Sequence, residues 1–240
     1  MTGGIGGVQG SLAEYAAVDA RLLAIKPASL SFKEAAAIPL AFITAWEALV
    51  DKAKIGEGMT LLIHGGSGSV GHIAIQLAKS FGAKVFATGS AENLKEIEEY
   101  GVTAIDYNAV PVAEYIDLYT DGKGFDVILD TVGGTVLDNS FLAVKKYTGH
   151  VVSILGWGSH SLAPLSFRGG TYSGVFTLAP LLSGEGREHH GEIMKNATQL
   201  ANSGQLKPEV NPKDFSFENI EEAYNGLENH TFKNRAIVLI

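Results

Sequence analysis

The feature that most constrains the fold is a glycine-rich turn between two apolar segments. Residues 60–64 read Thr-Leu-Leu-Ile-His, residues 65–71 read Gly-Gly-Ser-Gly-Ser-Val-Gly, and an amphipathic segment follows. Gly66, Gly68 and Gly71 fit the pattern G-x-G-x-x-G. Between a strand and a helix this pattern holds a pyrophosphate, because the helix start offers free N–H groups to an anion. The segment therefore predicts a dinucleotide site, and a glycine turn without a ligand is the alternative.

The three glycines are expected to do different things. Gly66 would turn the chain off the strand, Gly68 would let phosphate oxygens approach the backbone, and Gly71 would let the helix pack closely.

Two other glycine-containing motifs are not supported. The turn lacks the Gly-Lys-Ser/Thr of a Walker loop, and neither Ser67 nor Ser69 fits the G-x-S-x-G of a hydrolase nucleophile elbow.

Downstream of the turn, strand and helix patterns alternate. This alternation predicts an α/β fold in which a doubly wound parallel sheet is covered on both faces. Expected strands are 60–64, 84–88, 102–107, 126–130, 149–155 and 172–177, with helices at 91–100, 112–120 and 135–146. Outside this pattern we expect strands at 11–18, 25–27 and 236–240 and helices at 32–37, 44–54 and 217–228. The strands near both ends would need a partner outside the sheet.

Composition excludes several classes of function. A net charge of −8 argues against binding to a nucleic-acid backbone, and the absence of cysteine excludes disulfides and thiolate metal sites. The most apolar stretch, 35–50, is interrupted by Pro39 and Glu47 and falls short of the ~20 residues of a membrane span. The first residues form neither a basic nor an apolar signal region. We expect a cytoplasmic protein without membrane or nucleic-acid partners.

The residues after the second expected strand bear on the choice of coenzyme. An acid at that position binds the ribose 2′-OH of NAD and repels a 2′-phosphate, but here Gly89 and Ser90 stand there. Lys95 could add positive charge, or it could instead pair with Glu92 or Glu99 on a solvated helix face. These residues favour NADP(H). Tyr107, which ends the third strand, is placed beside the adenosine or serves as a structural tyrosine.

Other candidate sites are discounted. His189 and His190 are adjacent, so on a helix they point in different directions and share no metal. His64 ends a buried strand and is expected to be a core residue. The aromatic residues Trp157, Tyr172 and Phe176 either line a pocket for a flat substrate or belong to the core. We expect no metal site.

Several segments together resemble a known family, the zinc-independent quinone oxidoreductase branch of the medium-chain dehydrogenase/reductase superfamily. The resemblance rests on segments spread over nearly the whole chain: 10–15 (Gly-Ser-Leu-Ala-Glu-Tyr), 34–40, 44–49, 64–71, 125–134, 149–156 and 221–224. It implies a GroES-like β-rich catalytic domain, represented by a remnant at 1–40 and by a return at 206–240, around a Rossmann domain at 41–205. Most of the N-terminal part of that catalytic domain would then be missing, so we expect a truncated chain.

The resemblance also assigns roles by position. It places Gly66–Val70 on the pyrophosphate, Ser90 on the 2′-phosphate and Val132 and Gly133 against a ribose. It places Leu155, Gly156 and Phe176 near the nicotinamide and Thr44 near its carboxamide. The complete set of expected coenzyme-binding residues is Thr44, Gly66, Ser67, Gly68, Ser69, Val70, Gly71, Gly89, Ser90, Lys95, Tyr107, Val132, Gly133, Leu155, Gly156 and Phe176.

Two positions depart from relatives of the chain. The family often has a lysine three residues after the serine, where this chain has Asn93, and this weakens the preference for NADP(H). Zinc-dependent relatives carry a cysteine ligand where this chain has Leu40, which cannot bind zinc.

The expected function is an NADPH-dependent oxidoreductase that transfers hydride to a quinone or an activated alkene or carbonyl without zinc. No catalytic side chain is identified from the sequence. The alternative is an NADP(H)-binding module that lacks activity because the catalytic domain is truncated. The expected partners are a small-molecule electron acceptor and a second copy of the chain, which would associate as a homodimer through the exposed edge of residues 172–177.

Overall fold

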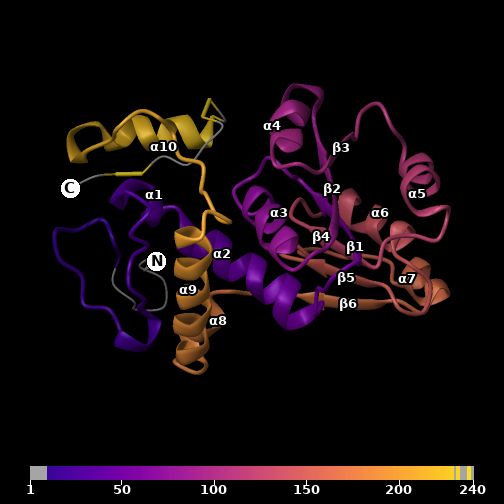
Figure 1. Ribbon diagram of the computed structural model, residues 1–240, viewed down its shortest axis with the longest axis horizontal. Coiled ribbons are helices and arrows are strands. Elements are labelled where there is room, and N and C mark those ends of the chain that lie inside the picture. The colour runs from indigo at the N-terminus through magenta and orange to yellow at the C-terminus, as the bar shows by residue number, and fades with distance from the viewer. Residues whose placement is uncertain (1–9, 230, 233–236, 239–240) are drawn as a thin grey trace. The chain divides into compact units, whose positions relative to one another are not determined.

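The computed structural model describes residues 10–229, 231–232 and 237–238 (Figure 1). The chain divides into two compact units. One unit is the continuous segment Thr44–Phe176. The other combines Met1–Ile43 with Thr177–Ile240.

A six-stranded sheet in which every pair of neighbouring strands is parallel forms the centre of the continuous unit. Its strands are β1 (Thr60–His64), β2 (Lys84–Gly89), β3 (Thr103–Asp106), β4 (Val127–Asp130), β5 (His150–Ser153) and β6 (Thr171–Gly174). Their order is β3-β2-β1-β4-β5-β6, which confirms the predicted Rossmann-type α/β fold. The order reverses direction between β1 and β4, and ligands of such sheets bind at this switch point.

Helices cover both faces of this sheet. They are α3 (Gly71–Ser80), α4 (Leu94–Glu99) after the 3₁₀ turn η3 (Ala91–Asn93), α5 (Val112–Thr120), α6 (Thr135–Ala143) and α7 (Ala163–Arg168). Before β1, α2 (Ile38–Trp46) continues into a π-helical segment, η2 (Glu47–Lys52). Figure 1 shows α3 and α4 on one side of the sheet and α5, α6 and α7 on the other.

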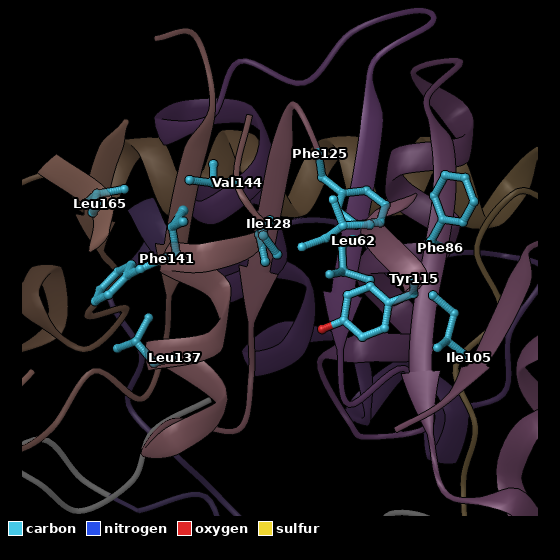
Figure 2. Packing of buried hydrophobic residues seen from close by; sticks show 13 residues of the cluster. Leu62, Phe86, Ile105, Tyr115, Phe125, Ile128, Leu137, Phe141, Val144 and Leu165 are labelled. Carbon is cyan, nitrogen blue, oxygen red and sulfur yellow. The ribbon is translucent and has the colours of Figure 1, made fainter. Parts of the chain in front are cut away.

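The face toward α5 and α6 carries a cluster of large buried side chains (Figure 2). Leu62, Phe86 and Ile128 come from three neighbouring strands, and α5 adds Tyr115. Each such side chain contributes about 1.5–3 kcal/mol through burial. Because parallel strands with helices on both faces have no solvent side, their sequences read as continuous apolar runs.

The other unit consists mainly of helices. They are η1 (Ala20–Leu22), α1 (Phe32–Ala36), α8 (Ala179–Ser183), α9 (Arg187–Asn202), η4 (Phe217–Asn219) and α10 (Ile220–Glu228). The longest of them, α9, packs against η1, where Arg187 forms an ion pair with Asp19 at 2.9 Å. Thr198 also donates a hydrogen bond to the carbonyl of Ile25 at 2.7 Å. These contacts assign α9 to this unit, although we expected the Rossmann domain to extend to residue 205.

Two strands expected near the start of the chain are not formed. Residues 11–18 and 25–27 are irregular. Leu12 and Tyr15, the apolar side chains that suggested a strand, are 45% and 86% exposed. An alternating pattern forms a strand only where a neighbouring backbone accepts its hydrogen bonds, and the described residues supply none here. Of the strand expected at 236–240, only residues 237 and 238 are described, and Val238 forms an isolated bridge with Phe215.

The last strand of the sheet begins and ends earlier than expected, at Thr171–Gly174 rather than at 172–177. Within the described part of the chain, no helix is both long and apolar enough to cross a membrane.

Candidate functional site

In the loop between β1 and α3, several positions require glycine because a larger residue would clash with neighbouring atoms or strain the backbone. Gly65 has φ +79°, so the sharp turn lies one residue before the predicted position. A Cβ on Gly66 would lie 2.7 Å from the Cβ of Ala87 on β2, and a Cβ on Gly71 would overlap the carbonyl oxygen of Gly65. Gly68 is exposed. The loop therefore lies tightly on the sheet and presents Gly68 outward.

Backbone donors gather at the start of α3. Gly68 donates its N–H to Gly65 and His72 donates its N–H to Gly68. By contrast, the N–H groups of Ser67, Ser69, Val70 and Gly71 donate to no acceptor in the described residues. Free N–H groups at a helix start carry partial positive charge and attract an anion. This loop therefore fits a pyrophosphate.

A cleft of about 960 Å³ opens beside this loop at the carboxyl ends of β1, β2 and β4. Six of the expected coenzyme-binding residues line it: Ser67, Gly68, Gly89, Ser90, Tyr107 and Val132. Other lining residues were not predicted from the sequence, among them Thr88, Thr131, Thr135 and Asn139. The site lies at the topological switch point, where an extended nucleotide would cross the sheet edge.

The end of the cleft after β2 has no acidic residue at position 89. A Cβ on Gly89 would lie 2.6 Å from the terminal methyl of Ile97, so a larger residue here would require that side chain to move. Asn93 Nδ2 donates a hydrogen bond to Ser90 Oγ at 3.0 Å, and both residues line the cleft. Lys95 is exposed on α4 and is not a lining residue. No lysine or arginine of the described residues lines this cleft.

The loop after β4 is held by Asp130, which is fully buried. Asp130 Oδ1 accepts hydrogen bonds from the N–H groups of Val132 (3.0 Å) and Gly133 (2.9 Å). Gly133 has φ +80°, and a Cβ on it would lie 2.6 Å from the carbonyl oxygen of Leu155. The loops after β4 and β5, which carry the predicted ribose and nicotinamide residues, thus touch each other.

A second cavity of about 370 Å³ lies at the carboxyl ends of β5 and β6. It is lined by Ser153, Ile154, Gly156, Trp157, Tyr172, Gly174, Val175 and Phe176. Trp157 and Phe176 meet edge to face, with ring centroids 6.3 Å apart, and are 65% and 49% exposed. These two aromatic side chains therefore line a cavity and are not part of the core. Thr44, which was expected near this end, is buried in α2 and lines neither cavity.

His64 and Tyr172 are among the side chains at this edge of the sheet whose pKa values are shifted. Burial lowers the pKa of His64 to about 4, so the imidazole is neutral at pH 7, with Nδ1 3.4 Å from Thr88 Oγ1. Its Nε2 has no hydrogen-bond partner in the described residues. Burial, and secondarily the charge of Asp130, raises the pKa of the Tyr172 hydroxyl, and a hydrogen bond with Ser153 opposes this shift.

Metal ligands do not gather in the described residues: no group of three histidine, cysteine or acidic side chains could hold an ion. His190 is buried and His189 is exposed, so the two adjacent imidazoles point apart.

Comparison with known proteins agrees with this architecture. The zinc-binding dehydrogenase family matches residues 69–185. The crystal structure of an alcohol dehydrogenase superfamily protein from Novosphingobium aromaticivorans is 52% identical, with a TM-score of 0.92 over 95% of this chain and 69% of that one. A 2-methylene-furan-3-one reductase from Solanum lycopersicum is 37% identical over 95% of this chain and 52% of its own length. An NADPH-dependent alkenal/one oxidoreductase from Arabidopsis thaliana is 34% identical over 95% of this chain and 53% of its own length.

The fold, together with the cleft beside the glycine-rich loop between β1 and α3, defines an α/β protein with the dinucleotide-binding architecture. The chain belongs to the medium-chain dehydrogenase/reductase superfamily, which confirms the resemblance seen in the sequence. It spans about half the length of the curated relatives just described.

Proposed function

We propose that this chain acts as an NADPH-dependent oxidoreductase that delivers hydride to a quinone or to an activated alkene or carbonyl, without zinc. The observation that carries the proposal is the set of free N–H groups of Ser67, Ser69, Val70 and Gly71 beside the 960 Å³ cleft. Two relatives are named as reductases of conjugated or carbonyl compounds, which supports this reaction class.

In this proposal the chain binds and orients the coenzyme. The loop amides hold the pyrophosphate, Val132 and Gly133 flank a ribose, and Leu155, Gly156 and Phe176 set the nicotinamide plane. Bound NADPH supplies the hydride. Trp157 and Phe176 exclude water and stack against a flat acceptor. Orientation of two bound reactants is the main contribution that such a site makes.

The preference for NADP(H) is proposed on the residues after β2. Ser90 and Asn93 offer hydrogen-bond donors to a 2′-phosphate, Tyr107 lies beside them, and Gly89 presents no competing carboxylate. Lys95 would act only at longer range from its exposed position. Zinc independence is proposed because Leu40 offers no metal ligand.

The first test titrates NADPH and NADH by fluorescence and then measures NADPH oxidation with a quinone and with an enone. Ser69→Asp places a negative charge among the free N–H groups, so NADPH affinity should fall at least about tenfold. Ser80→Asp, at the other end of α3, is the matched control and should leave affinity unchanged. If wild-type protein binds neither coenzyme, the proposal fails. If it binds NADPH and oxidises it with neither acceptor, the second hypothesis, a binding module, is favoured.

We also propose a homodimer. In the described residues β6 pairs only with β5, so the other edge of β6 is available to a second copy. Sedimentation at micromolar concentration should give a dimer. The N–H groups of Thr171 and Val175 point toward β5, so that of Gly174 faces the free edge of β6. Gly174→Pro, which removes this donor, should shift the species toward monomer. A monomeric wild-type protein would contradict the proposal. A cytoplasmic location stays a prediction.

A further inference from the structure

On one face of the sheet, the side chains change from apolar to polar at one set of register-matched positions near the carboxyl ends of the strands; we call this set the polar level. His64 pairs in register with Asp130, and Asp130 pairs with Ser153. Two residues earlier the same strands carry Leu62, Ile128 and Val151 of the core, the first two of which are labelled in Figure 2. The polar level coincides with the edge at which both cavities open.

Asp130 is the centre of this polar level. It is fully buried, and no cation pairs with it in the part of the chain that the structure describes. Its carboxylate instead accepts from the N–H groups of Val132 and Gly133 and from Ser153 Oγ at 2.7 Å. Burying a charge is unfavourable unless hydrogen bonds compensate it, and an apolar residue at this place would serve the core alone better. Two of the three donors belong to the loop after β4.

Ser153 extends the network to the loop after β5. Its Oγ donates to Asp130 and accepts from the N–H of Leu155 at 3.1 Å. Tyr172 on β6 forms a hydrogen bond with Ser153, and its hydroxyl lies so close to Gly156 that a Cβ on that glycine would overlap it. One carboxylate thus restrains both loops.

We infer that Asp130, acting with Ser153, is a positioning residue that fixes the loops after β4 and β5 relative to each other and so holds the nicotinamide end of the coenzyme. The inference rests on the proposed function, since it assigns Val132, Gly133, Leu155 and Gly156 to that end. The adenosine end depends on other residues, in the glycine loop and after β2. Loss of the network should therefore loosen one end of the coenzyme and spare the other.

The first experiment needs no coenzyme. Ser153→Ala removes a buried hydroxyl that bonds Asp130, and Ser140→Ala removes an equally buried hydroxyl that bonds the carbonyl of Val136 at 2.9 Å within α6. Amide hydrogen exchange should be about tenfold faster at residues 131–134 and 154–157 in Ser153→Ala only. Unchanged exchange there, or the same change in both variants, would overturn the inference.

The second experiment compares two ligands of the intact chain. NADPH contains both ends of the coenzyme, whereas adenosine 2′,5′-bisphosphate lacks the nicotinamide riboside. Ser153→Ala and Asp130→Asn should weaken NADPH about tenfold and leave the bisphosphate within twofold, and Ser140→Ala should change neither. Equal losses for both ligands would show a merely structural role. If the wild-type chain bound neither ligand, the proposed function would fail, while the exchange experiment would still decide whether Asp130 positions the loops.

Discussion

At the scale of single residues, the four glycines after β1 separate into distinct roles. Gly65 turns the chain, Gly66 and Gly71 permit close packing, and Gly68 faces outward. The motif predicted where the loop lies but not which glycine turns, because G-x-G-x-x-G specifies spacing and Gly65 and Gly66 are adjacent. Packing and ligand binding should therefore be separable by substitution.

Gly71→Ala should destabilise the fold by about 3 kcal/mol, because its Cβ would overlap the backbone of Gly65. Gly68→Ala should change the free energy of unfolding by less than ~1 kcal/mol, since its Cβ meets only the oxygen of Gly65 at 3.2 Å. Because Gly68 lines the cleft, the added methyl should interfere with the expected pyrophosphate, so NADPH affinity should fall. Urea unfolding and fluorescence titration of both variants measure the two effects, and equal destabilisation would contradict the assignment.

The choice between NADPH and NADH should depend on position 93. Asn93→Lys adds a cation to a cleft whose lining, in the described residues, contains no lysine or arginine. A charge-assisted hydrogen bond to the 2′-phosphate should tighten NADPH about tenfold and leave NADH unchanged. Lys95→Met should change the ratio of the two dissociation constants less than twofold. If Lys95→Met changed this ratio more than Asn93→Lys does, Lys95 would be a coenzyme-binding residue after all.

At the scale of elements, the loop between β5 and α7 is held to α6 by a hydrogen bond between a histidine and an aspartate. His160 Nδ1 lies 2.8 Å from Asp138 Oδ1, and His160 Nε2 lies 3.3 Å from the carbonyl of Trp157. The hydrogen bond with Asp138 is the main cause that raises the pKa of His160. His160 thus restrains the loop that carries Trp157 beside the second cavity, and the restraint is stronger when the imidazole is protonated.

This restraint should depend on pH with a defined sign. Because the pKa of His160 is raised in the folded state, the stabilisation is complete below pH ~6.5 and is lost as pH rises through the raised pKa. In a Trp46→Phe background, iodide quenching of Trp157 should therefore increase across that range. Asp138→Asn should remove this pH-dependent increase in quenching. A step of the same size in that variant would show that another group titrates.

At the scale of the whole molecule, the sheet was predictable from the sequence, whereas the irregular course of residues 11–18 and 25–27 was not. Strand β1 and helix α5 match their predicted bounds, Thr60–His64 and Val112–Thr120, because a continuous apolar run and a proline-initiated amphipathic segment are local signals. Helices α7 and α8 are too short to show a period. Similarly, the glycine loop and Ser90 were predictable from neighbouring residues. The Asp130–Ser153 bond was not, because it depends on the register of two strands.

Acid stability of the whole fold should reflect His64. Its pKa of about 4 lies below the value of ~6.5 for an exposed histidine, so the unfolded chain binds a proton first as pH falls. The stability due to neutral His64 is present above pH ~6.5 and decreases toward pH 4, by up to ~3 kcal/mol. Urea unfolding of His64→Leu should show a shallower decrease over this interval than wild type. If the free energy of unfolding fell equally with pH in wild type and His64→Leu, the assignment to His64 would be contradicted. His160→Asn is the control in which a different histidine is removed.

One unit is a continuous stretch of the chain and the other combines two segments, and this difference affects the order in which they can be completed during synthesis. Residues 44–176 are consecutive, so every contact within that unit can form while later residues are still being synthesised. The other unit must wait, because Asp19 meets Arg187 only after a further 168 positions have been translated. Until then the residues around Asp19 lack their partner helix α9. We expect them, more than the completed sheet, to be accessible to chaperones and proteases during synthesis.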